Sequence, residues 1–248
     1  MNLESILEDV SAGELSVTEA RERIEGFTRV DDFARFDTRR EDRNGVPEVI
    51  LADGKRPADV ASIAEQALEK KGRVIITRID DETKIALKDV QSSAIELEWI
   101  EQAQIMVLRT SEYEPPATDG TVAVLAGGTS DIPVAEEAAI TAREMGCKVE
   151  TIYDIGVAGI HRMFAERHQF DNADCVIVAA GREGALPTVV AGMVDAPVIG
   201  LPVSIGYGAG ADGKAALLGM LQSCTVLSVV NIDAGFVAGA QAAQAARG

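Results

Sequence analysis

The chain has 248 residues, 47% of them hydrophobic, which is enough for one large domain or two smaller ones with a sizeable core. Its 40 acidic and 23 basic residues give a formal net charge of −17, which argues against binding to nucleic acid or anionic membranes. Because no apolar run approaches the ~20 residues of a membrane span and the acidic start MNLESILEDVSAGELS lacks a signal-peptide pattern, we expect a cytoplasmic protein.

The first part of the chain is highly charged and predicts a small α/β unit. A helical pattern covers residues 3–24, and residues 46–54 predict a strand and turn. A helix is expected over residues 56–72, with Pro57 near its start and Gly72 after its end. Strands are expected over residues 73–79 and 103–110. The pattern of residues 81–90 is ambiguous.

The segment SEYEPPATDG, residues 111–120, is the best boundary in the sequence, because paired prolines and polar residues separate two apolar runs. We therefore expect domains over 1–115 and 116–248. The second part predicts five strands, at 121–128, 148–156, 173–181, 197–204 and 226–233. Helices are expected after them, at 131–146, 157–170, 182–194, 214–223 and 236–246. This alternation predicts a parallel, doubly wound sheet with helices on both faces.

Ligands of such sheets bind beyond the carboxyl ends of the strands, where this sequence places glycine and polar clusters. These candidates are Gly127, Gly128, Thr129, Ser130 and Asp131 after the first strand, Asp154, His161 and Arg162 after the second, Gly181, Arg182, Glu183, Gly184 and Ala185 after the third, and Ser204 after the fourth. Glycines let the backbone approach a ligand, and helix starts offer N–H groups to phosphate or carboxylate. Each cluster is also compatible with ordinary helix capping. The glycine-rich segment 202–213 is either a loop that closes over substrate or a plain connection.

Cys147, Cys175 and Cys224 stand far apart, without a CxxC pair, so the sequence predicts neither a zinc site nor a disulfide framework. Cys175 lies within an apolar strand pattern and Cys147 begins another strand, so both are interpreted as packed thiols. Cys224 lies where a helical pattern gives way to a strand. No cluster of metal ligands is visible. The acidic balance, with few lysines, also fits a protein from a high-salt cytosol, in which self-repulsion is screened.

Four segments carry a family resemblance: GGTSDIPVAEEA, GIHR, AAGREGALPTVVAGMVDAPVIGLPVS and LLGMLQSCTVLSVVNIDAGF. Residues 120–248 resemble the aminoimidazole ribonucleotide carboxylase (mutase, PurE-like) superfamily, which implies a flavodoxin-like fold. Glu183, Cys224 and the N-terminal part depart from the purine enzyme. They are similar to the LarB family, the carboxylase and hydrolase that begins synthesis of the nickel-pincer nucleotide cofactor used in lactate racemase maturation.

This resemblance implies a substrate, nicotinic acid adenine dinucleotide, whose pyridinium ring is carboxylated at C5 with CO₂. It also implies hydrolysis of the phosphoanhydride, which releases AMP and pyridinium-3,5-biscarboxylic acid mononucleotide. The resemblance puts the role of nucleophile on Cys224. Glu183 is the first candidate for the base that removes the C5 proton and His161 the second, while Ser130 and Asp131 wall the CO₂ pocket.

No tightly bound cofactor is expected, although Mg²⁺ is plausible on the substrate diphosphate. The phosphates are expected on the amides of 127–130 near Arg162 or Arg182, and adenine on the N-terminal part. Since Cys224 precedes its strand, it should lie at the sheet edge opposite the other candidates. We therefore expect sites shared between subunits of a homo-oligomer, an octamer by resemblance. The alternatives are an aminoimidazole ribonucleotide carboxylase of purine synthesis, which needs no cysteine, and a nucleotide-binding regulator without catalysis.

Overall fold

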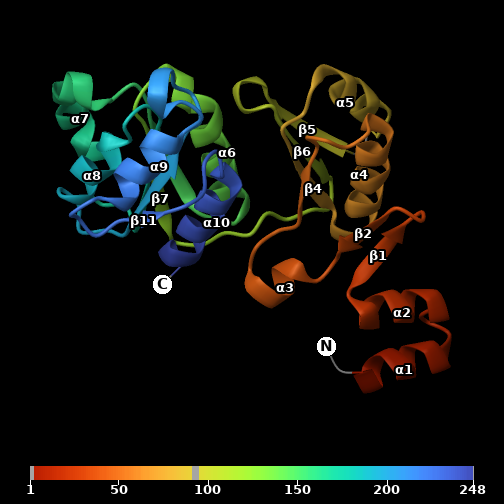
Figure 1. The fold of residues 1–248 in the computed structure, drawn as a ribbon. Coiled ribbons are helices and arrows are strands. Elements are labelled where there is room, and N and C mark those ends of the chain that lie inside the picture. Colours follow the sequence, from red (N-terminus) through yellow and green to blue (C-terminus); the bar gives the residue numbers. More distant parts are fainter. Residues whose placement is uncertain (1–2, 91–94, 248) are drawn as a thin grey trace. The chain divides into compact units, whose positions relative to one another are not determined.

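Strands and helices alternate through the second half of the chain in the computed structural model, which describes residues 3–90 and 95–247 (Figure 1). The strands are β7 (Thr121–Ala126), β8 (Lys148–Ile152), β9 (Cys175–Ala180), β10 (Val198–Pro202) and β11 (Ser228–Val229). The helices that follow them are α6 (Ile132–Glu144), α7 (Ile160–Glu166), α8 (Ala185–Ala191), α9 (Lys214–Leu221) and α10 (Gly235–Ala246). Each expected element is present, but the last strand is reduced to two residues.

The five strands form a parallel sheet in the order β11-β10-β9-β7-β8. The α/β prediction and its flavodoxin-like form are therefore confirmed, because this is the doubly wound order in which the first strand lies between the second and the third. The strand order reverses between β7 and β9, and the loops that follow these strands diverge there. That point of the sheet is where such folds bind ligands.

Helices cover both faces of this sheet (Figure 1). Helices α6 and α10 pack against each other on one face. Helices α7, α8 and α9 cover the other face, where their apolar side chains join those of β7 and β9 in one core. Strand β9 is buried along its whole length, which explains its unbroken apolar sequence CVIVAA.

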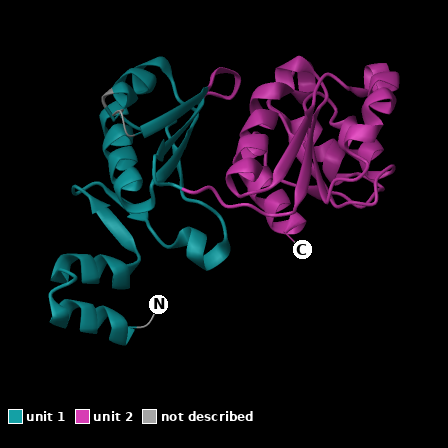
Figure 2. Ribbon diagram, turned by 180° about the vertical axis from the view of Figure 1, so that it is seen from behind, with its two compact units in different colours: residues 1–99, 105–113 teal, residues 100–104, 114–248 magenta. Residues whose placement is uncertain are grey.

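By its internal contacts the chain divides into two units (Figure 2): residues 1–99 with 105–113 form unit 1, and residues 100–104 with 114–248 form unit 2. Unit 1 contains α1 (Leu3–Ala12), α2 (Val17–Glu25), β1 (Phe27–Val30), β2 (Ala34–Asp37), α3 (Arg40–Asn44), β3 (Val49–Leu51), α4 (Pro57–Lys71), β4 (Arg73–Thr77), α5 (Asp81–Ala86), β5 (Ile95–Ile100) and β6 (Ile105–Thr110). A four-stranded sheet, in the order β3-β4-β6-β5, packs its core against α4.

The prediction of one helical stretch over residues 3–24 was wrong, because α1 ends at Ala12 and α2 begins at Val17. Gly13 has a positive φ of 75°, and Ser16 forms a reciprocal capping box with Glu19 at the start of α2. The sequence did not predict the β1–β2 hairpin, which pairs Phe27 with Asp37. Among the helices of the described residues, none is long and apolar enough to cross a lipid bilayer.

Candidate functional site

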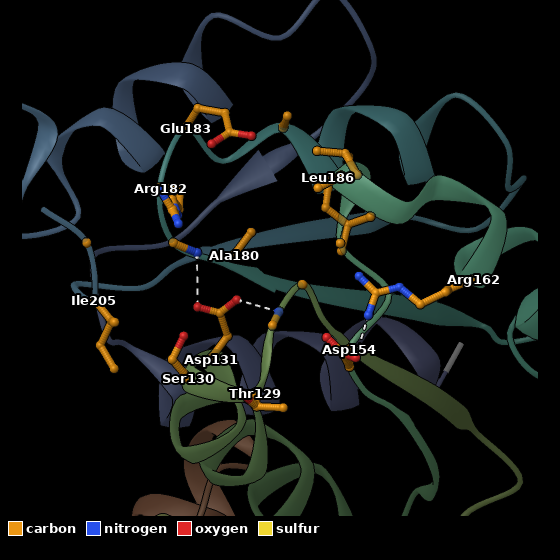
Figure 3. Close-up of a pocket in the computed structure, with 18 of the residues that line it drawn as sticks. Thr129, Ser130, Asp131, Asp154, Arg162, Ala180, Arg182, Glu183, Leu186 and Ile205 are labelled. Carbon is orange, nitrogen blue, oxygen red and sulfur yellow. Dashed lines mark hydrogen bonds and ion pairs between the residues drawn. The ribbon is translucent and has the colours of Figure 1, made fainter.

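A cavity of about 790 Å³ lies where the loops after β7, β8 and β9 meet, at the carboxyl edge of the unit 2 sheet. Many of the residues predicted from sequence line it: Gly127, Gly128, Thr129, Ser130, Asp131, Asp154, Arg162, Gly181, Arg182, Glu183 and Ala185. Figure 3 shows Arg162 with Asp154 on one side of the cavity, Arg182 and Glu183 on the other, and Asp131 between them. The structure therefore gathers strand-end residues from three loops around one space.

Asp131 holds two of these loops together. It is 6% exposed and accepts hydrogen bonds at both oxygens: Oδ2 from the amide of Gly128, at 2.9 Å, and Oδ1 from the amide of Gly181, at 3.2 Å (Figure 3). Burial raises the pKa of Asp131, while the two amide hydrogen bonds act to lower it. The side chain joins the loop after β7 to the loop after β9, on the two sides of the switch point.

The backbones of the loops touch directly, and glycine makes this contact possible. A Cβ atom on Gly156 would lie 2.6 Å from the carbonyl oxygen of Gly127, and one on Gly181 would lie 2.5 Å from that of Ile205. Both distances are shorter than real Cβ contacts allow. Gly156 and Gly181 therefore allow the backbones of neighbouring loops to approach each other closely, whereas the sequence suggested glycines for the approach of backbone to a ligand.

Arg162 and Asp154 form an ion pair on one rim of the cavity. Both side chains remain partly exposed, at 39% and 54%. Asp154 has a φ of 59°, a left-handed conformation that is unfavourable for most residues with a side chain, although Asp and Asn tolerate it better than others. The pair presents a guanidinium group to the cavity beside the amides that follow β7, an arrangement suited to anions.

Arg182 and Glu183 stand on the opposite rim, just before α8. Both are exposed, and Arg182 also has a left-handed φ of 53°. The guanidinium of Arg182 donates a 2.7 Å hydrogen bond to the hydroxyl of Tyr207. Glu183 offers a carboxylate to the cavity, as a general base requires.

Four predicted residues do not line this cavity. Gly184 is buried against Ala216 of α9, and the amide of Ser204 donates to Asp233 Oδ1 at 2.8 Å. His161 is exposed on α7, next to Arg162. The fourth residue is Cys224.

Cys224 is exposed in the connection between α9 and β11. Its neighbour Thr225 donates a 3.4 Å hydrogen bond to the carbonyl of Thr188, in α8. All three cysteines lie in the described part of the chain. The thiols of Cys147 and Cys175 are buried. Burial raises the pKa of Cys175 to about 11, so that thiol stays protonated at neutral pH.

In the loop after β10 the sequence singled out Ser204 alone, yet Ile205, Gly206 and Tyr207 are the residues of this loop that line the cavity. The glycine-rich pattern of residues 202–213 was the signal available, and it allowed a plain connection as well. Within residues 3–90 and 95–247, no three His, Cys, Asp or Glu side chains come together as a metal site.

Comparison with known proteins gives two matches to family models. The LarB/PurE-like N-terminal domain matches residues 27–111, and the AIR carboxylase domain matches residues 121–247. An uncharacterized protein of Methanocaldococcus jannaschii is 38% identical over 245 residues, which cover 96% of this chain and 94% of that protein. The N5-carboxyaminoimidazole ribonucleotide mutase of the same organism is 34% identical over 119 residues, or 46% of this chain and 71% of the mutase.

The mutase of the same name from Pyrococcus horikoshii is 28% identical over 114 residues, which cover 44% of this chain and 62% of that enzyme. The AIR carboxylase match covers the half of the chain that carries the cavity. The N-terminal match lies in unit 1 except for residues 100–104, which count with unit 2. Together, the two domain matches show that the chain belongs to the LarB family, with a carboxylase-type C-terminal domain similar to AIR carboxylase.

Proposed function

We propose that the protein carboxylates the pyridinium ring of nicotinic acid adenine dinucleotide at C5 and hydrolyses its phosphoanhydride, giving pyridinium-3,5-biscarboxylic acid mononucleotide and AMP. The observation that carries the proposal is the combination of a strand-end cavity bearing Glu183 with one exposed thiol, Cys224. An aminoimidazole carboxylase has no use for such a thiol, whereas pyridinium chemistry requires a nucleophile of this kind.

A pyridinium ring is electron-poor, so its C5 does not attack CO₂ directly. Addition of the Cys224 thiolate at C4 removes the ring's positive charge and makes C5 enamine-like. C5 then forms the new C–C bond to CO₂, Glu183 removes the C5 proton, and expulsion of the thiolate restores the aromatic ring. A thiolate fits because it is a good nucleophile and also a good leaving group.

The anionic parts of the substrate fit the charges of the cavity. The amides of Thr129 and Ser130 and the guanidinium of Arg162 offer hydrogen-bond donors on one rim, and Arg182 offers another on the opposite rim. We propose that these groups bind the phosphates and that Mg²⁺, where it takes part, arrives with the diphosphate. Asp131 acts as a positioning residue in this scheme, because both of its oxygens already accept amide hydrogen bonds.

We further propose that Cys224 reaches the cavity of a neighbouring copy of the chain. It lies outside the lining of its own cavity and close to an apolar surface, defined by Leu218, Leu221 and Val226, which are 60%, 62% and 95% exposed. An apolar surface of this kind commonly marks a protein interface. A second copy seated there would cover it and bring a thiol to a cavity that lacks one.

The experiment is incubation of the purified protein with nicotinic acid adenine dinucleotide and bicarbonate, followed by mass spectrometry. We expect a product that carries one more carboxylate than nicotinic acid mononucleotide, together with AMP. Cys224→Ala should abolish carboxylation, and Cys175→Ala should retain it as the matched control. Undiminished turnover by Cys224→Ala would rule out the thiolate mechanism.

The purine-type mutase is the second candidate, because the AIR carboxylase domain matches the half of the chain that holds the cavity and two mutases are similar to nearly half of the chain. The same preparation should therefore be incubated with N5-carboxyaminoimidazole ribonucleotide. Conversion of that substrate, insensitive to alkylation of the thiols, would favour the mutase over the pyridinium carboxylase.

A further inference from the structure

Tyr207 is an aromatic side chain exposed on the wall of the cavity. It is 75% exposed, compared with 54% for Phe164, an aromatic residue of α7 outside the cavity lining. It stands between Gly206 and Gly208 in the connection from β10 to α9, and Gly208 has a φ of 78°. A large ring with little protein around it and glycines on both sides is free to pack against a ligand.

The structure holds this ring over the cavity by two contacts. The backbone of Ile205 passes so close to Gly181 that a Cβ atom there would lie 2.5 Å from the Ile205 carbonyl oxygen. Beyond that crossing, the guanidinium of Arg182 lies 4.6 Å from the centre of the Tyr207 ring and donates to its hydroxyl. The loop is therefore docked at the cavity mouth before any ligand binds.

The backbone of Arg182 has a left-handed conformation, with a φ of 53°. This conformation is unfavourable for a residue with a side chain, and such strain concentrates at ligand-binding sites. A guanidinium group over an aromatic ring, next to a cavity, combines the two groups that recognise a nucleotide: a cation for phosphate and a flat surface for a base.

We propose that Tyr207 is the stacking platform for the purine base of the substrate's AMP half, with Arg182 binding the adjoining phosphate. The inference rests on the proposed function, which supplies a dinucleotide as substrate, and it assigns the base to unit 2 instead of the N-terminal part. A phosphate oxygen is a stronger acceptor for the guanidinium than the phenol, so the ligand takes Arg182 from the Tyr207 hydroxyl and leaves the ring to the base.

The order of groups along this rim agrees with the order of groups in a dinucleotide. Glu183, which we propose as the base that acts on the pyridinium ring, stands next to Arg182 on the rim. Arg182 in turn contacts Tyr207. The cavity volume of about 790 Å³ lies in the upper part of the range for ligand sites, which leaves room for a ligand larger than a mononucleotide.

The experiment compares the wild type with Tyr207→Ala, Tyr207→Phe and, as an exposed aromatic outside the cavity, Phe164→Ala. Isothermal titration with AMP and with nicotinic acid mononucleotide is measured first, and steady-state kinetics with the full dinucleotide second. We expect Tyr207→Ala to weaken AMP binding and raise KM for the dinucleotide by roughly tenfold, within the range measured for loss of a base–aromatic stack. Tyr207→Phe keeps the ring and should bind AMP like the wild type.

Unchanged AMP affinity and KM in Tyr207→Ala, in a wild type that turns over the dinucleotide, would overturn the inference and leave the proposed function standing. Weakened binding of nicotinic acid mononucleotide with intact AMP binding would also overturn it, because the ring would then hold the pyridinium. Loss of AMP binding in Tyr207→Ala, in a protein whose wild type does not carboxylate the dinucleotide, would refute the proposed function and support the base site.

Discussion

The carboxylate of Asp131 accepts a hydrogen bond from the amide of Gly181, 50 residues further along the chain, and so ties together the loops after β7 and β9. Its other oxygen accepts from Gly128. Asp131→Asn keeps one acceptor but turns an amide NH₂ towards the second N–H donor, which leaves a buried amide unpaired. We expect the free energy of unfolding to fall by about 1–3 kcal/mol, measured by urea denaturation of the purified chain.

Ser130→Ala is the matched control for this substitution, because Ser130 is an exposed neighbour in the same loop. It should change the free energy of unfolding by no more than about 0.5 kcal/mol. Equal stability of Asp131→Asn and the wild type would mean that the bridge between the loops contributes little.

The three cysteines should differ in reactivity towards iodoacetamide in the native protein. Cys224 is exposed, whereas Cys147 and Cys175 are buried and the pKa of Cys175 is raised to about 11. Because the thiolate is the reacting form, Cys224 should be modified first. Peptide mass spectrometry after short alkylation at pH 8 measures the order, and labelling in denaturant shows that all three thiols can react. Early modification of Cys175 would contradict the packing of β9.

Two inactive variants should restore activity when their subunits are mixed, if the site is shared. Cys224→Ala retains Glu183, and Glu183→Gln retains Cys224, so a hybrid oligomer contains some sites with both groups. We expect partial recovery of carboxylation after the two variants are co-expressed or dissociated and reassembled. If both residues act within one chain, every site lacks one group, and the mixture should stay as inactive as its components.

Asp174 gives unit 2 a stabilising contribution that depends on pH. Its Oδ2 accepts from both the amide and the hydroxyl of Thr121, at 2.7 Å, and these bonds lower the pKa of Asp174 below 3.8. A carboxylate whose pKa is lower in the folded state stabilises the protein above the unfolded value and loses that effect as the pH falls through the folded value. Asp174→Asn should therefore flatten the loss of stability below pH 3.8.

Urea denaturation of the wild type and Asp174→Asn between pH 2 and pH 6 measures this difference. Asp154→Asn is a control on another exposed aspartate, one that contacts Arg162 instead of Thr121. Parallel stability curves for the wild type and Asp174→Asn would show that the hydrogen bonds to Thr121 do not shift the proton equilibrium.

The net charge of −17 predicts a stability that rises with salt. Surface carboxylates repel one another, and the screening length falls from about 10 Å at 0.1 M salt to about 3 Å at 1 M. We expect the thermal midpoint to rise as KCl increases over this range. A midpoint independent of KCl would contradict the expectation that the chain suits a high-salt cytosol.

Much of unit 2 follows from sequence alone, because buried parallel strands read as apolar runs such as CVIVAA and alternate with helix patterns. Unit 1 was harder. The break between α1 and α2 had a local signal, Gly13 followed by the capping-box pair Ser16 and Glu19, which the long helical pattern obscured. The short β1–β2 hairpin is made of charged and apolar residues without a glycine turn, so its sequence gives little sign of pairing.

The site was predictable where it depends on strand ends and unpredictable where it depends on distant contacts. In a parallel sheet the carboxyl ends of the strands share one edge, which places Gly127, Asp131 and Gly181 at that edge. This rule does not say that Asp131 binds the amide of Gly181, because that contact depends on the path of both loops. The approach of Tyr207 to Arg182 likewise depends on how the loop after β10 crosses Gly181.

The pairing of β7 with β9 has a consequence for the order of folding. Helix α6, strand β8 and helix α7 lie between them in sequence, so the chain must close a loop of some 50 residues before these two strands meet. A chain that has joined β7 only to β8 has one wall of the cavity and no Gly181 to oppose it. Ligand binding at this cavity would therefore require that the centre of the sheet is complete.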